Sequence, residues 1–104
     1  MRIIIAGAGD VGTHLAKMLS SELHDIVIID YNEENLKGID ATLDIMTITG
    51  KATSFEVLKE AQIKKADLFI AVTNSEETNI TSTIIAKRLG ANQTIARVDN
   101  PAHQ

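Results

Sequence analysis

Residues 2–12, RIIIAGAGDVG, decide the fold of this 104-residue chain. Arg2–Ala6 is a short apolar run, typical of a buried strand. The segment Gly7–Gly12 follows at once and matches the pattern G-x-G-x-x-G. Apolar residues then recur at the spacing of one helix face, at Val11, Leu15, Met18 and Leu19. The sequence therefore predicts a strand, a glycine-rich turn and a helix, in that order.

Strand-like and helix-like patterns alternate along the rest of the chain, which is typical of a parallel α/β sheet. Further strands are predicted at Ile26–Ile29, Ile45–Ile48, Leu68–Val72 and Thr94–Val98. Helices are predicted from Glu33 to about Ala41, after Thr53, and from Asn74 to a stop at Gly90. We therefore expect one domain over residues 1–104, a Rossmann-like three-layer αβα fold with an open parallel sheet.

Capping patterns locate the predicted helix starts. Thr53 with Glu56, and Asn74 with Glu77, have the spacing of capping boxes. The last of these helices is expected to carry Ile80, Ile84, Ile85 and Leu89. Asp99-Asn100-Pro101 resembles the cap and first residue of a further helix, so we expect the chain to be truncated there.

Composition excludes several classes of function. The net charge of −4, with 44% hydrophobic and 23% charged residues, disfavours nucleic acid as a partner. The chain has no cysteine, which excludes disulfides, thiolate metal sites and cysteine nucleophiles and fits a reducing, cytoplasmic compartment. The apolar run at the N-terminus is too short for a membrane span, so no direct membrane insertion is expected. His14, His24 and His103 lack metal-ligand spacing, and no metal site or catalytic relay is predicted.

The glycine motif and Asp30 together predict a dinucleotide site. One glycine makes the tight turn, the second lets the backbone approach a pyrophosphate, and the third lets helix and strand pack closely. Asp30 ends the second strand, where an acidic residue binds the adenosine ribose. Its charge would repel the 2′-phosphate of NADP, so NAD is favoured. The alternative is that the glycines only make a turn and Asp30 only caps the next helix.

Other polar residues follow strands at the same expected edge of the sheet. Lys51 follows the third strand and either reaches adenosine or is a solvated loop lysine. Thr73 and Asn74 follow the fourth strand and either face the ligand or only cap the next helix. Arg97 stands in an apolar stretch, so we expect an anionic partner, a phosphate or a neighbouring carboxylate. The predicted cofactor contacts are Gly7, Ala8, Gly9, Asp10, Val11, Gly12, Asp30, Lys51, Thr73, Asn74 and Arg97.

Longer stretches resemble one known family. They are Ile3–Gly12, IDYNEENL at Ile29–Leu36, LKEAQIKKADLFIAVTNSEETNI at Leu58–Ile80 and IARVDNP at Ile95–Pro101. On these stretches the whole chain resembles the N-terminal nucleotide-binding domain of Trk and Ktr potassium-uptake regulatory proteins, also called the RCK or KTN domain.

The resemblance implies a regulatory rather than a catalytic role. In that family the domain lies at the cytoplasmic face of a cation channel, forms homodimers or larger rings, and binds NAD, NADH or ATP to alter gating. It implies a cytoplasmic subunit held at the inner face of the membrane by a potassium-translocating partner. Family members continue past Pro101 into a helix and a sixth strand, so five strands are expected here. Many relatives carry an acidic residue at Lys51, which implies either a backbone contact or a more anionic ligand at that position.

Three hypotheses follow from these observations. A ligand-regulated gating module explains why the sheet edge has cofactor-binding residues but no catalytic residues. A ligand that binds two conformations with unequal affinity shifts their equilibrium without any reaction. The alternative of an NAD-dependent oxidoreductase fragment requires a proton-transfer residue and a substrate pocket, and neither is evident. An interaction domain with a vestigial site predicts no nucleotide binding. We favour the gating module and expect no enzyme activity.

Overall fold

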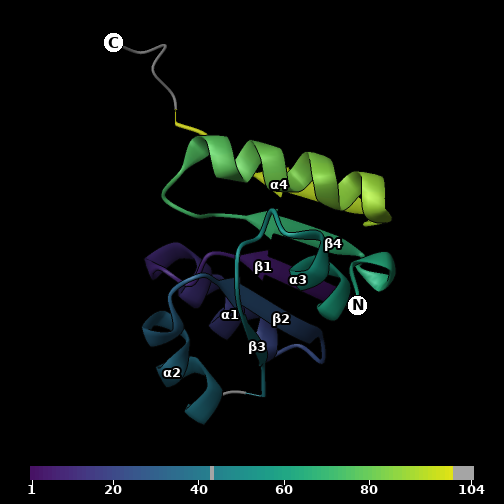
Figure 1. The fold of residues 1–104 in the computed structure, drawn as a ribbon. Helices are drawn as coiled ribbons and strands as arrows, with labels where there is room; N and C mark the ends of the chain where they lie inside the picture. Colours follow the sequence, from purple (N-terminus) through teal and green to yellow (C-terminus); the bar gives the residue numbers. More distant parts are fainter. Residues whose placement is uncertain (43, 100–104) are drawn as a thin grey trace.

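The strands form one parallel five-stranded sheet in the order β3-β2-β1-β4-β5. The structure is a computed structural model, which describes residues 1–42 and 44–99 (Figure 1). The strands are β1 Arg2–Ala6, β2 Asp25–Asp30, β3 Met46–Thr49, β4 Leu68–Ala71 and β5 Gln93–Ala96. The helices are α1 Asp10–Ser20, α2 Glu33–Thr42, α3 Phe55–Glu60 and α4 Glu76–Leu89, with a 3₁₀ helix, η1, at Ile63–Lys65. The predicted Rossmann-like fold is confirmed.

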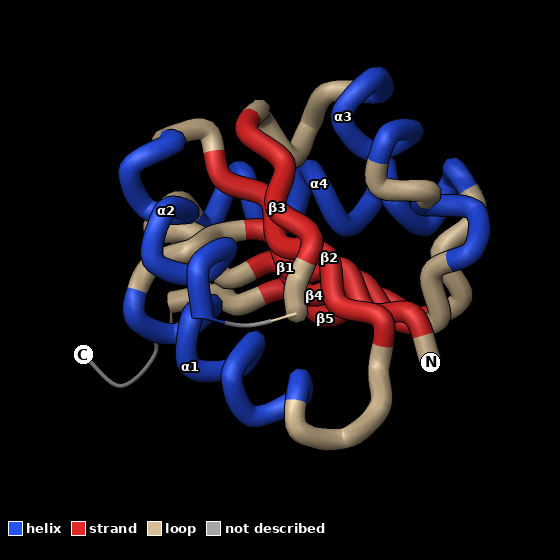
Figure 2. The backbone as a smooth tube through the Cα atoms, turned by 90° about the horizontal axis from the view of Figure 1, so that it is seen from below, coloured by secondary structure: helices blue, strands red, loops and turns tan. Residues whose placement is uncertain are grey.

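Helices cover both faces of the sheet. Figure 2 shows α1 and α2 on one side of the strands and α3 and α4 on the other. Successive strand residues point to opposite faces, so Ile3 and Ile5 pack toward α1 and α2, while Ile4 and Ala6 pack toward α3 and α4. Because both faces are buried, β1 and β2 are continuous apolar runs rather than alternating ones.

The strand order reverses beside β1, and this reversal places the site. β1 pairs with β2 on one side and with β4 on the other, and every pairing is parallel. The segments that leave β1 and β4 therefore diverge at the carboxyl edge. In open α/β sheets ligands bind in the crevice at such a switch point.

Both helix N-caps lie one residue after the predicted position, and neither observed cap has the Glu or Gln of a capping box three residues later. Ser54, and not Thr53, caps α3, because its hydroxyl accepts the Val57 N–H at 3.4 Å. A turn in which the Ser54 N–H donates to the Lys51 carbonyl precedes the helix and delays its start. Likewise Ser75, and not Asn74, caps α4 by accepting the Thr78 N–H at 3.1 Å.

The ends of the elements differ slightly from the prediction. Gly90 ends α4 as predicted, with φ of +123°, a conformation that L side chains rarely adopt. β5 begins at Gln93 and ends at Ala96, two residues before the predicted end at Val98. The predicted helix start at Asn100 and Pro101 lies outside the described residues.

The helix α4 carries Ile80, Ile84, Ile85 and Leu89 as expected, but these are not its most buried residues. Ile80 and Ile84 are 40% and 57% exposed, whereas the residues of α4 that are buried are Asn79, Ser82, Thr83 and Ala86. These small and polar side chains let the helix backbone approach the sheet. Ile85 and Leu89 pack at the border of the core. Of the described helices, none has both the length and the apolar character needed to cross a membrane.

Candidate nucleotide-binding site

A cavity of about 460 Å³ opens at the carboxyl edge of the sheet, where the segments after β1, β2, β3 and β4 meet. It is bounded by the glycine loop on one side and by the start of α4 on another. Its lining residues are Gly7, Gly9, Ile29, Asp30, Tyr31, Asn35, Gly50, Lys51, Ala52, Thr53, Val72, Thr73, Asn74, Ser75 and Thr78. The topology thus gathers residues that are far apart in the sequence around one hollow.

The glycines of the motif have different structural roles. Gly7 has φ of +112°, and a Cβ there would lie 3.0 Å from the Thr73 nitrogen and the Val72 carbonyl. A Cβ on Gly12 would collide with the Gly7 carbonyl, so helix and strand pack too closely for a side chain. A Cβ on Gly9, by contrast, would have no neighbour within 4 Å, and its φ is −78°. The fold requires Gly7 and Gly12, whereas Gly9 leaves open space at the N-terminus of α1.

Asp30 joins the glycine loop to the loop after β2. The carboxylate is buried, and its Oδ2 accepts the Ala8 N–H at 2.7 Å. Its Oδ1 accepts the Asn32 N–H at 2.8 Å and the Asn35 Nδ2 at 3.4 Å. A carboxylate offers about four acceptor positions, and these bonds use three of them. The remaining capacity on Oδ2 suits a hydroxyl donor.

The opposite wall of the cavity is held by Asn79, which the sequence analysis missed. Its Oδ1 accepts the Thr73 N–H at 2.9 Å and the Thr73 hydroxyl at 2.6 Å. The side chain lies on α4 and is 1% exposed. Thr73 therefore faces the cavity from a fixed backbone position.

The cavity lining includes Gly7, Gly9, Asp30, Lys51, Thr73 and Asn74 from the predicted set. Ala8, Asp10, Val11 and Gly12 lie beside it, in the glycine loop and the first turn of α1, but do not line it. The lining also contains polar residues that were not predicted as ligand contacts, namely Tyr31, Asn35, Thr53, Ser75 and Thr78. Tyr31 and Asn35 follow Asp30 closely, so their place after β2 was the available signal.

Arg97 departs from the expectation. It lies outside the lining, and its side chain is exposed, with no ion-pair partner among the described residues. The apolar stretch around Arg97 does not bury it, because its neighbours Ile95 and Val98 are each 53% exposed at the edge of the sheet. Contact of Arg97 with a ligand stays a prediction.

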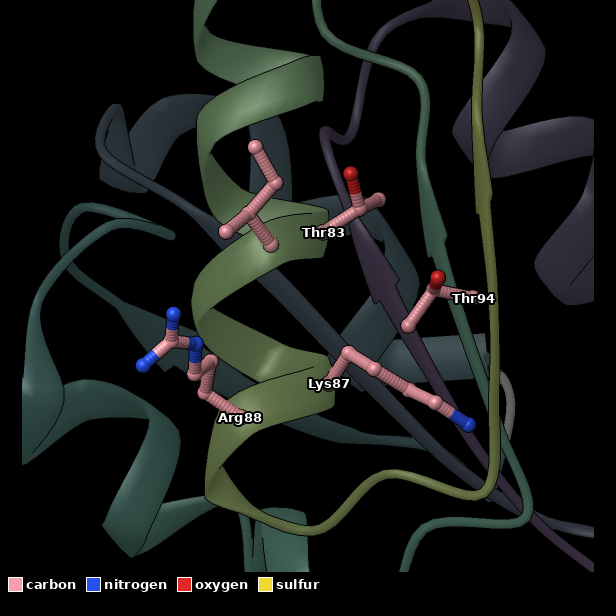
Figure 3. A pocket seen from close by; sticks show the side chains of 5 residues that line it. Thr83, Lys87, Arg88 and Thr94 are labelled. Carbon is pink, nitrogen blue, oxygen red and sulfur yellow. The ribbon is translucent and has the colours of Figure 1, made fainter.

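A second cavity, of about 480 Å³, lies between α4 and β5 (Figure 3). Thr83 and Lys87 lie on the side of α4 toward Thr94, whereas the Arg88 side chain, which also lines the cavity, extends away from Thr94. The Thr83 hydroxyl donates to the Ile80 carbonyl at 2.8 Å, and Lys87 Nζ donates to the Asn92 carbonyl. None of the predicted ligand contacts lines this cavity.

No cluster of three metal-ligating side chains occurs in the part of the chain that the structure describes. His103 lies outside that part. The groups that line the cavity at the carboxyl edge of the sheet are backbone groups, hydroxyls, the side-chain amides of Asn35 and Asn74, one carboxylate and one ammonium group.

Sequence comparison identifies relatives along nearly the whole chain. The model of the TrkA-N domain family matches residues 3–104. The Trk system potassium uptake protein TrkA homolog of Archaeoglobus fulgidus is 43% identical over 103 residues, which are 99% of this chain and 23% of that protein. The homolog of Pyrococcus horikoshii is 43% identical over 97% of this chain and 45% of its own length. The TrkA protein of Halomonas elongata is 36% identical over 98% of this chain and 22% of its own length. The chain spans less than half of each.

Solved structures share the fold. The GsuK channel matches 98% of this chain and 18% of its own, with a TM-score of 0.82 and 22% identity. The Kef CTD of Shewanella denitrificans in AMP-bound form matches 91% of this chain and 57% of its own, with a TM-score of 0.74 and 21% identity. The Bordetella bronchiseptica enzyme WbmG in complex with NAD matches 90% of this chain and 36% of its own, with a TM-score of 0.68 and 23% identity.

Proposed function

Because this chain belongs to the TrkA-N domain family, we propose that it is the nucleotide-binding domain of a regulatory subunit of a potassium uptake system. Its ligand is NAD or NADH, with ATP as a further candidate. Binding changes the conformation of the subunit and thereby the gating of the channel. The names of the relatives, Trk system potassium uptake proteins, support this assignment.

The observation that carries the proposal is the open space at Gly9 beside a rigid glycine loop. Gly7 and Gly12 cannot accept a side chain, whereas the space over Gly9 is free of protein atoms. The N–H groups at the start of α1 lack helical partners, and such groups favour a phosphate. A pyrophosphate fits this cradle. The backbone of Gly9, Asp10, Val11 and Gly12 would hold it at the helix start, while Gly7 and Ala8, whose N–H groups donate to the Ile29 carbonyl and to Asp30, would shape the loop.

Asp30 fits the ribose of an adenosine. Its carboxylate lines the cavity and retains acceptor capacity on Oδ2, so it suits ribose hydroxyls. The same negative charge disfavours the 2′-phosphate of NADP. Lys51 lines the same cavity and supplies its cation, which favours an anionic ligand. Thr73 and Asn74, on the far wall, would face the second half of a dinucleotide, and Arg97 lies farther along that edge.

We propose no catalytic step. The ionisable side chains of the cavity lining are Asp30, Tyr31 and Lys51, and Asp30 already holds two loops by hydrogen bonds. Regulation needs no reaction, because a nucleotide that binds two arrangements unequally changes their ratio. The partners would be a potassium-translocating membrane subunit and a second copy of this protein. The subunit would then lie in the cytoplasm at the inner face of the membrane.

Calorimetry on the purified chain tests the proposal, with NADH, NAD, NADPH and ATP as the titrants. We expect binding of NADH or NAD, weaker binding of NADPH, and no heat with a Gly9→Val variant. Failure of all four nucleotides to bind would contradict the proposal and favour an interaction domain with a vestigial site. Steady turnover of NADH with an added substrate would favour the oxidoreductase alternative.

A further inference from the structure

One buried amide joins the wall of the cavity to the segment that leaves the sheet after β5. Asn79 Oδ1 accepts both the N–H and the hydroxyl of Thr73. Asn79 Nδ2 donates to the Thr73 carbonyl at 3.1 Å and to the Arg97 carbonyl at 2.9 Å. Thr73 lines the cavity, and Arg97 follows the last residue of β5. A single side chain therefore contacts both segments.

The orientation of this amide is fixed by its partners. An asparagine offers two acceptor and two donor positions, and all four are used here. A flipped amide would place its NH₂ group against the Thr73 N–H, donor against donor. Since Asn79 is 1% exposed, no solvent replaces a lost bond. A movement of Thr73 that shifts the Asn79 amide therefore also changes the hydrogen bond between Asn79 Nδ2 and the Arg97 carbonyl.

The first turn of α4 makes a second contact with residues 97–99, the segment that follows β5. The Asp99 N–H donates to Glu76 Oε1 at 2.7 Å, and the Arg97 N–H donates to the Ala71 carbonyl at 2.9 Å. Residues 97–99 are thus placed by the end of β4 and the start of α4. These elements also form one wall of the cavity.

We propose that Asn79 is a positioning residue that couples occupancy of the cavity to the position of residues 97–99. The Thr73 hydroxyl has a single proton and two acceptors within reach, Asn79 Oδ1 at 2.6 Å and the Ser75 carbonyl at 3.2 Å, of which Asn79 Oδ1 is the nearer. A ligand oxygen that takes this proton removes one of the two bonds on Oδ1, and the amide then readjusts toward its remaining partners. The readjustment moves the Arg97 carbonyl and the segment behind it. This inference rests on the proposed function only in naming a nucleotide as the ligand.

A ligand-free experiment tests the coupling by amide NMR of the purified chain. Thr73→Val, which removes the hydroxyl, is expected to shift the amide resonances of residues 97–99. Thr73→Ser, which keeps the hydroxyl, is expected to leave them in place. Thr53→Val is the matched control, because Thr53 lines the same cavity from another segment and makes no hydrogen bond to Asn79. Equal responses to Thr73→Val and Thr73→Ser would overturn the proposal.

The Asn79→Ala background completes the test. In that background Thr73→Val is expected to leave residues 97–99 unshifted, because the connecting amide is gone. An undiminished shift there would overturn the proposal. If Asn79→Ala does not fold, Asn79→Ser, which loses the amide that reaches the Arg97 carbonyl, replaces it as the background, because the Thr73 hydroxyl also bonds Ser75 at the start of α4.

The same amide resonances are then measured in the presence of saturating NADH. We expect NADH to shift residues 97–99 in the natural sequence and to shift them less in Asn79→Ala at equal saturation. Equal shifts would overturn the coupling. If NADH, NAD and ATP all fail to bind the natural sequence, the proposed function fails, while the ligand-free experiment still decides whether Asn79 couples the two segments.

Discussion

The carboxylate of Asp30, at the end of β2, accepts the backbone N–H of Ala8, in the glycine loop after β1, at 2.7 Å. The residue proposed to bind the ribose therefore also places the loop proposed to bind the phosphates. Ala8 is buried, so this N–H depends on the carboxylate for its hydrogen bond. One side chain thus links the two halves of the site.

Asp30→Ala is expected to weaken NADH binding and to destabilise the fold. Each effect should be about 1–3 kcal/mol, because the ribose loses a charged acceptor and the buried Ala8 N–H loses its partner. Calorimetry measures the first effect and urea unfolding the second. Glu34→Ala is the control, since Glu34 is exposed and makes only a surface ion pair with Lys37. Reduced stability with unchanged affinity would leave Asp30 a structural role only.

Gly9→Val and Gly12→Ala are expected to separate binding from folding. At Gly9 the side chain enters free space at a helix N-cap, so stability should fall by only about 1 kcal/mol while NADH binding is lost. At Gly12 a single methyl group collides with the Gly7 carbonyl, so stability should fall by about 3 kcal/mol or more. Circular dichroism during urea unfolding and calorimetry measure both. A Gly9→Val chain that still binds NADH would place the phosphates elsewhere.

Asp30→Ser combined with Tyr31→Arg is expected to shift preference toward NADPH. The change removes the repelling carboxylate and adds a guanidinium at the cavity, and a charge-assisted hydrogen bond is worth about 1.5–3 kcal/mol. The ratio of NADPH to NADH affinity should rise by about tenfold or more. Tyr31→Leu alone, which keeps Asp30, should leave the ratio unchanged. A ratio that does not respond to the double change would contradict the electrostatic basis of selectivity.

The sheet and its ligand edge could be predicted because their signals are local. Continuous apolar runs identify strands buried on both faces, and the glycine motif places a turn between a strand and a helix. Gly7 and Asp30 follow β1 and β2 directly, so parallel pairing brings them to one edge. Residues on both sides of the cavity could therefore be predicted from the sequence.

The contacts made by α4 could not be predicted in the same way. The isoleucines of α4 have helical spacing, but small and polar residues are the buried ones, since the helix packs closely on the sheet. Asn79 is buried because Thr73 and the Arg97 carbonyl, from two other segments, satisfy its amide. Neither partner is close enough in sequence to give a local signal. Tertiary contacts of this kind decide which polar residues a helix buries.

Ser54→Ala is expected to lower stability by about 1 kcal/mol, and Thr53→Ala by less. Ser54 accepts the Val57 N–H at the start of α3, whereas Thr53 lies in the preceding turn. Adjacent hydroxyl residues are equivalent in a sequence pattern, so only the backbone conformation selects the cap. Urea unfolding of the two variants measures the difference. A larger loss of stability for Thr53→Ala than for Ser54→Ala would indicate that Thr53, as the sequence predicts, caps the helix.

The last prediction concerns regulation in the full-length protein with its membrane partner. NADH and NAD are expected to change potassium flux without being consumed, because the cavity provides binding groups and regulation needs only unequal affinity for two arrangements. A difference of about 1.4 kcal/mol between the arrangements would change their ratio tenfold. Flux through reconstituted vesicles, recorded together with the absorbance of reduced nicotinamide, measures both the change in flux and the consumption of NADH.

A Gly9→Val protein is the control, because its potassium flux should not respond to nucleotide if the nucleotide acts at this cavity. Flux that ignores nucleotide in the natural protein, or that changes only with stoichiometric oxidation of NADH, would contradict regulation by binding alone.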